Sequence, residues 1–69
     1  MTDTTKTLIA CIAVKLSLDA KTVKRWVKSN GYSVDQLLFI EKQISLNEIP
    51  IPKLISAIVN NSEYRISIY

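Results

Sequence analysis

The stretch from residue 9 to residue 28 constrains the fold most, because its small and apolar residues have the spacing that two closely crossing helices require. Ala13 stands where the second helix crosses closest to the first, so a longer side chain would push the two helices apart. Ser17 and Leu18 form the turn, and Leu18 closes the gap beneath it. The inward positions of the two helices carry only apolar side chains, which are Ile12, Ala13, Leu16, Val23 and Trp26. This spacing predicts two helices joined by a tight turn.

Capping signals bound these two helices. Three residues near the N-terminus are candidate caps for a helix that runs to about residue 16, namely Asp3, Thr4 and Thr5. Asp19 can cap the second helix by accepting from backbone N–H groups of its first turn, and its charge suits the positive end of the helix dipole. That helix is expected to end at about residue 29, because Asn30 and Gly31 both tolerate positive φ.

Two more helices are expected downstream. Ser33 and Gln36 have the spacing of a capping box and start a third helix, whose predicted buried positions are Val34, Leu37, Leu38 and Ile44. Pro52 suits the first turn of a fourth helix, where its missing N–H has no consequence. The fourth helix presents Leu54, Ile55, Ile58 and Val59 on one side. We therefore expect a small all-α domain of about four helices over residues 1–69.

The C-terminal tail has a different period. From Tyr64 to Tyr69, apolar and polar side chains alternate, which is the pattern of a strand. A single strand has no partner within this chain. We expect it to pair with the same tail of a second subunit or to remain disordered.

The apolar content also bears on oligomeric state. The chain has 69 residues, of which 48% are hydrophobic, and a monomer of this size buries only a small core. Part of the apolar surface is therefore expected in a subunit interface, most commonly that of a two-fold homodimer. The expected dimerisation region is residues 34–69, and its interface residues are Phe39, Ile40, Leu54, Ile58, Tyr64, Ile66 and Ile68.

Positive charge is concentrated in one segment. Between residues 15 and 28 there are five basic residues and one acidic residue, whereas the rest of the chain has four basic and five acidic residues. A solvated basic face is the ordinary explanation for such a cluster on an arbitrary helix. Its coincidence with the spacing of the turn favours phosphate binding instead.

These residues resemble a known family. The spacing over residues 9–28 is similar to the helix-turn-helix of the Cro and C1-type phage repressors, the lambda-repressor-like group, and it is carried by Ile12, Ala13, Leu16, Leu18, Val23 and Trp26. Ser17 occupies the turn position where that family usually has Gly, so its backbone must reach a left-handed conformation or form a different turn. The resemblance implies a sequence-specific DNA-binding transcription regulator, a repressor, that acts as a homodimer in successive major grooves of double-stranded DNA.

The same resemblance assigns the expected DNA contacts. Residues of the second helix that face base edges would be Ala20, Lys21, Lys24 and Arg25. Lys24 or Arg25 would suit guanine O6 and N7. Lys15 and Lys28 would flank them on phosphates. Trp26 is expected in the core with its N–H on a carbonyl or water, and Tyr32 either donates to a phosphate or packs over the turn.

Catalytic chemistry lacks its usual residues. There is no His, and the one Cys has no base or second ligand at a recognisable spacing, so neither a metal site nor a thiolate nucleophile is expected. A single Gly cannot build a glycine-rich phosphate loop, and we expect no cofactor and no enzyme activity. Cys11 is expected to be a small buried hydrophobe in a reduced, cytoplasmic protein without a signal peptide or membrane span.

A second binding function stays open at this point. The chain could be a small phage or plasmid protein whose apolar third and fourth helices bind and inhibit a host protein, with the helix-turn-helix as a scaffold. Salt dependence separates the two hypotheses, because DNA binding through several phosphates weakens steeply with salt and apolar docking does not.

Overall fold

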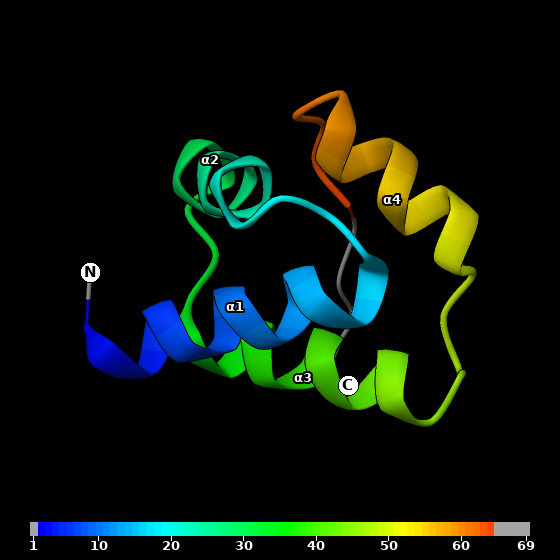
Figure 1. Cartoon of the computed structure of the whole chain (residues 1–69), viewed down its shortest axis with the longest axis horizontal. Coiled ribbons are helices and arrows are strands. Elements are labelled where there is room, and N and C mark those ends of the chain that lie inside the picture. The colour runs from blue at the N-terminus through cyan, green and yellow to red at the C-terminus, as the bar shows by residue number, and fades with distance from the viewer. Residues whose placement is uncertain (1, 65–69) are drawn as a thin grey trace.

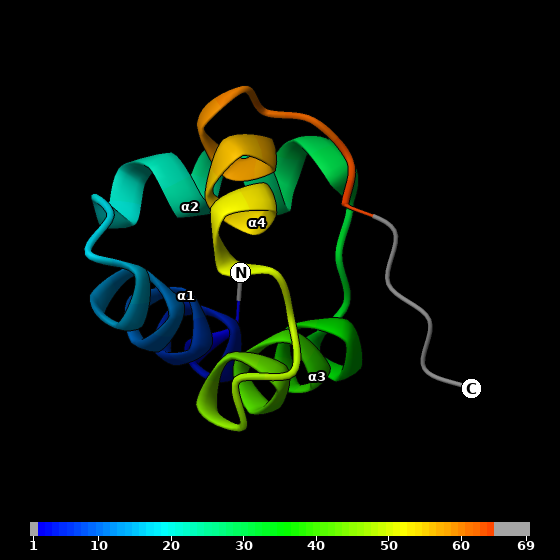
Figure 2. The same cartoon turned by 90° about the vertical axis from the view of Figure 1, so that its right-hand side faces the viewer.

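A computed structural model describes residues 2–64 as four helices in two layers (Figure 1). The helices are α1 (Asp3–Leu16), α2 (Ala20–Asn30), α3 (Val34–Ser45) and α4 (Ile51–Val59). The first layer contains α1 and α3, and the second contains α2 and α4 (Figure 2). The described residues contain no strand, so the all-α prediction is confirmed. The expected C-terminal strand, with Ile66 and Ile68, falls on residues 65–69, outside the described part.

The helix-turn-helix geometry follows from the turn after α1. Ser17 adopts the left-handed conformation, with φ 57° and ψ 39°, which ends α1 and turns the chain toward α2. The Leu18 N–H donates to the Ala13 carbonyl at 2.8 Å and closes the end of α1. Ala13 is buried, α1 packs against α2, and Figure 1 shows α2 nearly end-on while α1 lies across the view. The predicted turn is confirmed, and the burial of Ala13 agrees with the predicted close crossing.

The caps agree with the sequence in part. Ser33 forms the predicted capping box, since its hydroxyl accepts from the Gln36 N–H and its own N–H donates to the Gln36 side chain at 2.8 Å. The predicted caps of α1 are wrong by at least one residue, because Thr2 has the extended backbone of a cap and accepts from the Thr5 N–H. Asp19 occupies the cap position of α2, but its side chain makes no capping hydrogen bond there.

The core is built around Trp26. Its side chain is fully buried, and its Nε1–H donates to the Ser62 carbonyl at 2.6 Å, which ties the segment after α4 to the back of α2. The ring also packs on Tyr32, with centroids 4.6 Å apart. Its prediction as a core residue bonded to a carbonyl is confirmed. The other buried residues of the core are Leu8, Ile9, Ile12, Ala13, Leu16, Val23, Val27, Leu37, Ile40, Leu54 and Ile58.

Three residues that were expected at a dimer interface belong to this core. Ile40, Leu54 and Ile58 are 1%, 0% and 0% exposed, respectively, so the prediction that they cover a second subunit is wrong. The reason is that α4 packs against α2 and buries Leu54 and Ile58, while α3 packs against α1 and buries Ile40. The side chains of Phe39 and Tyr64 are half-buried.

Two predictions of burial are also wrong. Leu38 is 47% exposed, because the buried stripe of α3 runs through Leu37 and Ile40 and turns Leu38 outward. Cys11 is exposed rather than buried, since α1 presents its opposite face to the core and leaves Cys11 beside the exposed Val14. Within residues 2–64, no helix has the length and apolarity needed to cross a membrane.

The crossing and the turn predict opposite effects for two substitutions. Ala13→Leu forces a larger side chain between α1 and α2 and should destabilise the domain by about 1–3 kcal/mol. Ser17→Gly relieves the left-handed backbone and should stabilise it by up to about 1 kcal/mol, less the entropy that Gly adds to the unfolded chain. Thermal unfolding followed by circular dichroism measures both. A neutral Ala13→Leu together with a destabilising Ser17→Gly would contradict the close crossing.

Candidate nucleic-acid interface

The candidate interface is the outward face of α2. The inward side chains of this helix are Val23, Trp26 and Val27, and all three are buried. Because the side-chain pattern of a helix repeats every 3.6 residues, the outward positions fall together on one face. They are Ala20, Lys21, Lys24, Arg25 and Lys28, and every one of them is exposed. The structure thus brings together five of the six predicted DNA contacts.

The four cations of this face have no acidic partner in residues 2–64, where one ion pair is present and lies elsewhere. Lys21 and Lys24 are three positions apart, and Lys24 and Lys28 are four apart, so like charges are neighbours along the helix surface. Such pairs destabilise a helix by about 0.2–0.5 kcal/mol each in the absence of an anion. The face is therefore electrostatically complementary to an anionic partner.

Lys15 differs from the other predicted contacts. It lies on α1, where its ammonium forms an ion pair with Glu41 and a hydrogen bond with Ser45, both on α3. The hydrogen bond from Lys15 lowers the pKa of the Glu41 carboxyl. The structure does not bring Lys15 to the cationic face of α2, and its charge is already balanced within the chain.

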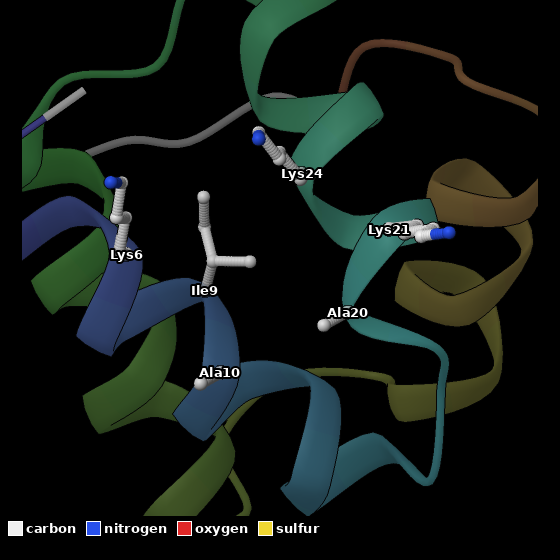
Figure 3. Close-up of a pocket in the computed structure, with 6 residues that line it drawn as sticks. All are labelled: Lys6, Ile9, Ala10, Ala20, Lys21 and Lys24. Carbon is white, nitrogen blue, oxygen red and sulfur yellow. The ribbon is translucent and has the colours of Figure 1, made fainter.

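A hollow opens between α1 and the first turns of α2 (Figure 3). It is lined by Lys6, Ile9, Ala10, Ala20, Lys21 and Lys24. Figure 3 shows the side chain of Ile9 between the two helices, with the ammonium groups of Lys6 and Lys24 on the same side of the hollow. Lys6 thus extends the cationic surface from α2 onto α1.

Lys6 was not predicted as part of the cationic surface, although its spacing in the sequence could have indicated it. The first helix was expected to begin near residue 3, and Lys6 stands three and four positions before Ile9 and Ala10. Residues at these separations share a helix face. Extending the expected outer face of the motif by one turn toward the N-terminus would have included Lys6.

The phenol of Tyr32 is used inside the chain. Its O–H donates to the Tyr64 carbonyl at 3.0 Å, and its oxygen accepts from the Tyr64 N–H at 2.8 Å. Burial raises the pKa of this phenol. Of the two roles considered for Tyr32, the geometry agrees with packing, since both of these hydrogen bonds fasten residue 64 to the end of α2.

The site consists of cations and apolar surface. Residues 2–64 bring together no group of three side chains suited to holding a metal ion. Among the residues that form the outward face of α2 and the hollow, there is no serine, cysteine or histidine and no carboxylate. No protein-family model, curated protein or solved structure matches this chain. The arrangement itself is suited to bind a polyanion.

The ion pair between α1 and α3 predicts a pH-dependent contribution to stability. Because the pKa of Glu41 is lower in the folded chain than its ordinary value of 4.5, the ion pair stabilises the fold above that pH, and its contribution is lost as the pH falls through the lower, folded-state pKa. Glu41→Gln should therefore lower the melting temperature at neutral pH, and the difference from wild type should shrink in acid.

Thermal unfolding at neutral and acidic pH measures this effect. Glu48→Gln is the matched control, because Glu48 is exposed and forms no ion pair among residues 2–64. It should leave the melting temperature unchanged at both pH values. A difference between wild type and Glu41→Gln that stays constant with pH would show that the ion pair does not stabilise the fold.

Proposed function

We propose that this chain is a sequence-specific DNA-binding transcription regulator of the Cro type that represses by occupying its operator. The observation that carries this proposal is the cationic outward face of α2, which follows a left-handed turn at Ser17 and a close crossing at Ala13. In proteins with this arrangement, the second helix enters the major groove and the first helix crosses the DNA backbone.

The dimensions and chemistry of α2 agree with this role. A helix with its side chains is about 10–12 Å in diameter and fits the major groove, which is about 12 Å wide. The core holds the inner side of α2 through Trp26, so its outward side is presented as a rigid surface. In the proposed complex, Ala20, Lys21, Lys24 and Arg25 face base edges, and Lys28 contacts a phosphate.

The proposed regulator acts as a homodimer with two-fold symmetry. Two recognition helices then reach half-sites about 34 Å apart, one turn of DNA. With Ile40, Leu54 and Ile58 in the core, the expected interface keeps Phe39 and Tyr64 among its described residues, together with residues 66 and 68 outside them. The apolar surface that a partner subunit could cover also includes the exposed Leu38, Leu46 and Val59.

The alternative, a protein that inhibits a host protein through its apolar C-terminal helices, has less support. The apolar stripe of α4 is Leu54 and Ile58, and it is already covered by α2. The two functions can be distinguished by measuring the affinity of the chain for a fluorescent random-sequence duplex at increasing salt concentrations. DNA binding should lose orders of magnitude in affinity between about 50 and 200 mM salt, and a flat response would contradict the proposal.

Arg25 is predicted to read a base. Arg25→Ala should weaken binding to the selected operator by about 1–3 kcal/mol and change binding to random duplexes little, because a bidentate guanine contact exists only on the correct site. Gel-shift titrations with both duplexes measure the two affinities. The matched comparison is Lys28→Ala, which should weaken both equally. If Arg25→Ala weakened binding to the operator and to random duplexes equally, Arg25 would contact only a phosphate.

The homodimer is a separate prediction. Light scattering at micromolar concentration should give twice the chain mass of 7.8 kDa. Phe39→Glu places a charge at the expected interface and should shift the equilibrium to monomer, whereas Lys42→Glu, at an exposed position on the same helix, should not. A monomer that binds a palindromic operator without cooperativity would refute the dimer.

A further inference from the structure

The hollow between α1 and α2 is more than a continuation of the cationic face. Its interior is formed by Ile9 from α1 and by two alanines, Ala10 and Ala20, whose side chains end at the Cβ atom. Three lysines contribute to its lining, and the ammonium groups of Lys6 and Lys24 lie beside it, whereas that of Lys21 points away from it (Figure 3). An apolar depression with a cationic border differs from the rest of the outward face of α2, where charged side chains dominate.

We propose that this hollow receives the 5-methyl group of a thymine in the major groove, an inference that rests on the proposed function. The methyl group of thymine is the apolar group that base pairs present in the major groove, and Ala is among the residues that contact it. Ala20 is the first residue of α2, and it faces the hollow together with Ala10 of α1. The hollow thus gives the interface a thymine preference beside the lysines.

The charges around the hollow favour DNA as its occupant over an apolar segment of a protein. An apolar segment that covered the hollow would bring no negative charge to the ammonium groups of Lys6 and Lys24, which lie beside it. A thymine enters with phosphates of its own strand nearby, and these can pair with the ammonium groups. Lys6, on the helix that crosses the DNA backbone, is placed to contact such a phosphate.

The alanines also explain why the space stays open. A longer side chain at residue 10 or residue 20 would extend into the hollow and fill it. Ala10 is exposed, so the core does not require a small residue at this position. The hollow can therefore be filled by substitution at Ala10 without altering the packing between α1 and α2.

The test uses duplexes recovered from a random-sequence pool by repeated gel-shift selection. Each thymine of the recovered site is replaced in turn by deoxyuridine, which keeps the base pair and the phosphates and lacks only the methyl group. At the thymine seated in the hollow, wild type should bind the deoxyuridine duplex roughly fourfold more weakly, the effect of one buried methyl group.

Two variants assign that effect to the hollow. Ala10→Gln fills the hollow, so its affinities for the thymine and deoxyuridine duplexes should become equal at that position. Cys11→Gln changes the neighbouring exposed residue of α1, outside the hollow, and should keep the fourfold difference. Circular dichroism confirms that each variant is folded, and the ratio of affinities is independent of any general loss of binding.

The outcomes are distinguishable. Salt-dependent binding in which no single thymine is sensitive to loss of its methyl group would overturn the thymine site and leave the proposed function intact. A thymine effect that persists in Ala10→Gln would also overturn it, because the methyl group would then be read elsewhere. Failure of the chain to bind any duplex at low salt would overturn both proposals.

Discussion

The close crossing of α1 and α2 is the contact on which the rest of this structure depends. It favours a residue as small as the buried Ala13 and needs a sharp change of chain direction after α1, which Ser17 provides by adopting positive φ. A larger side chain at Ala13, or a β-branched residue at Ser17, would oppose this geometry. Because α2 carries the cations, Ala13 and Ser17 determine the orientation of the candidate interface, although neither residue is part of it.

The buried side of α2 is also held in place, by contacts with the segment that follows α4. Trp26 is fully buried, and its indole N–H and the Tyr32 phenol both bind backbone groups of residues 62–64. These bonds connect the end of the described chain to the helix that presents the site. The outward face, by contrast, gathers like charges whose mutual repulsion no acidic side chain among residues 2–64 relieves. A cluster of like charges that lowers the stability of the fold, on a helix that the core holds in place, is typical of a binding site.

Sequence reasoning succeeded at several positions where local rules determine the outcome, although the α1 cap and the Asp19 capping bond were predicted wrongly. The turn, the capping box at Ser33 and the buried Trp26 depend on spacings of a few residues. It failed where the outcome depends on which helix covers which face. Periodicity showed that Leu54 and Ile58 share a stripe, but it could not show that α2 would cover that stripe in place of a second subunit. The hollow is lined by residues of two helices, so the helix periodicity of neither one alone could predict it.

The central claim, that α2 and the adjoining turns of α1 form a DNA-binding face, is tested most directly by NMR. Backbone amide shifts of the labelled protein are followed during titration with a selected duplex and with a scrambled duplex of equal length. The account predicts that the selected duplex shifts amides of residues 6–10 and 19–28 most, while α3 and the exposed side of α4 change little. Shifts concentrated on α3 and α4, or identical patterns of equal size with both duplexes, would contradict sequence-specific recognition by α2.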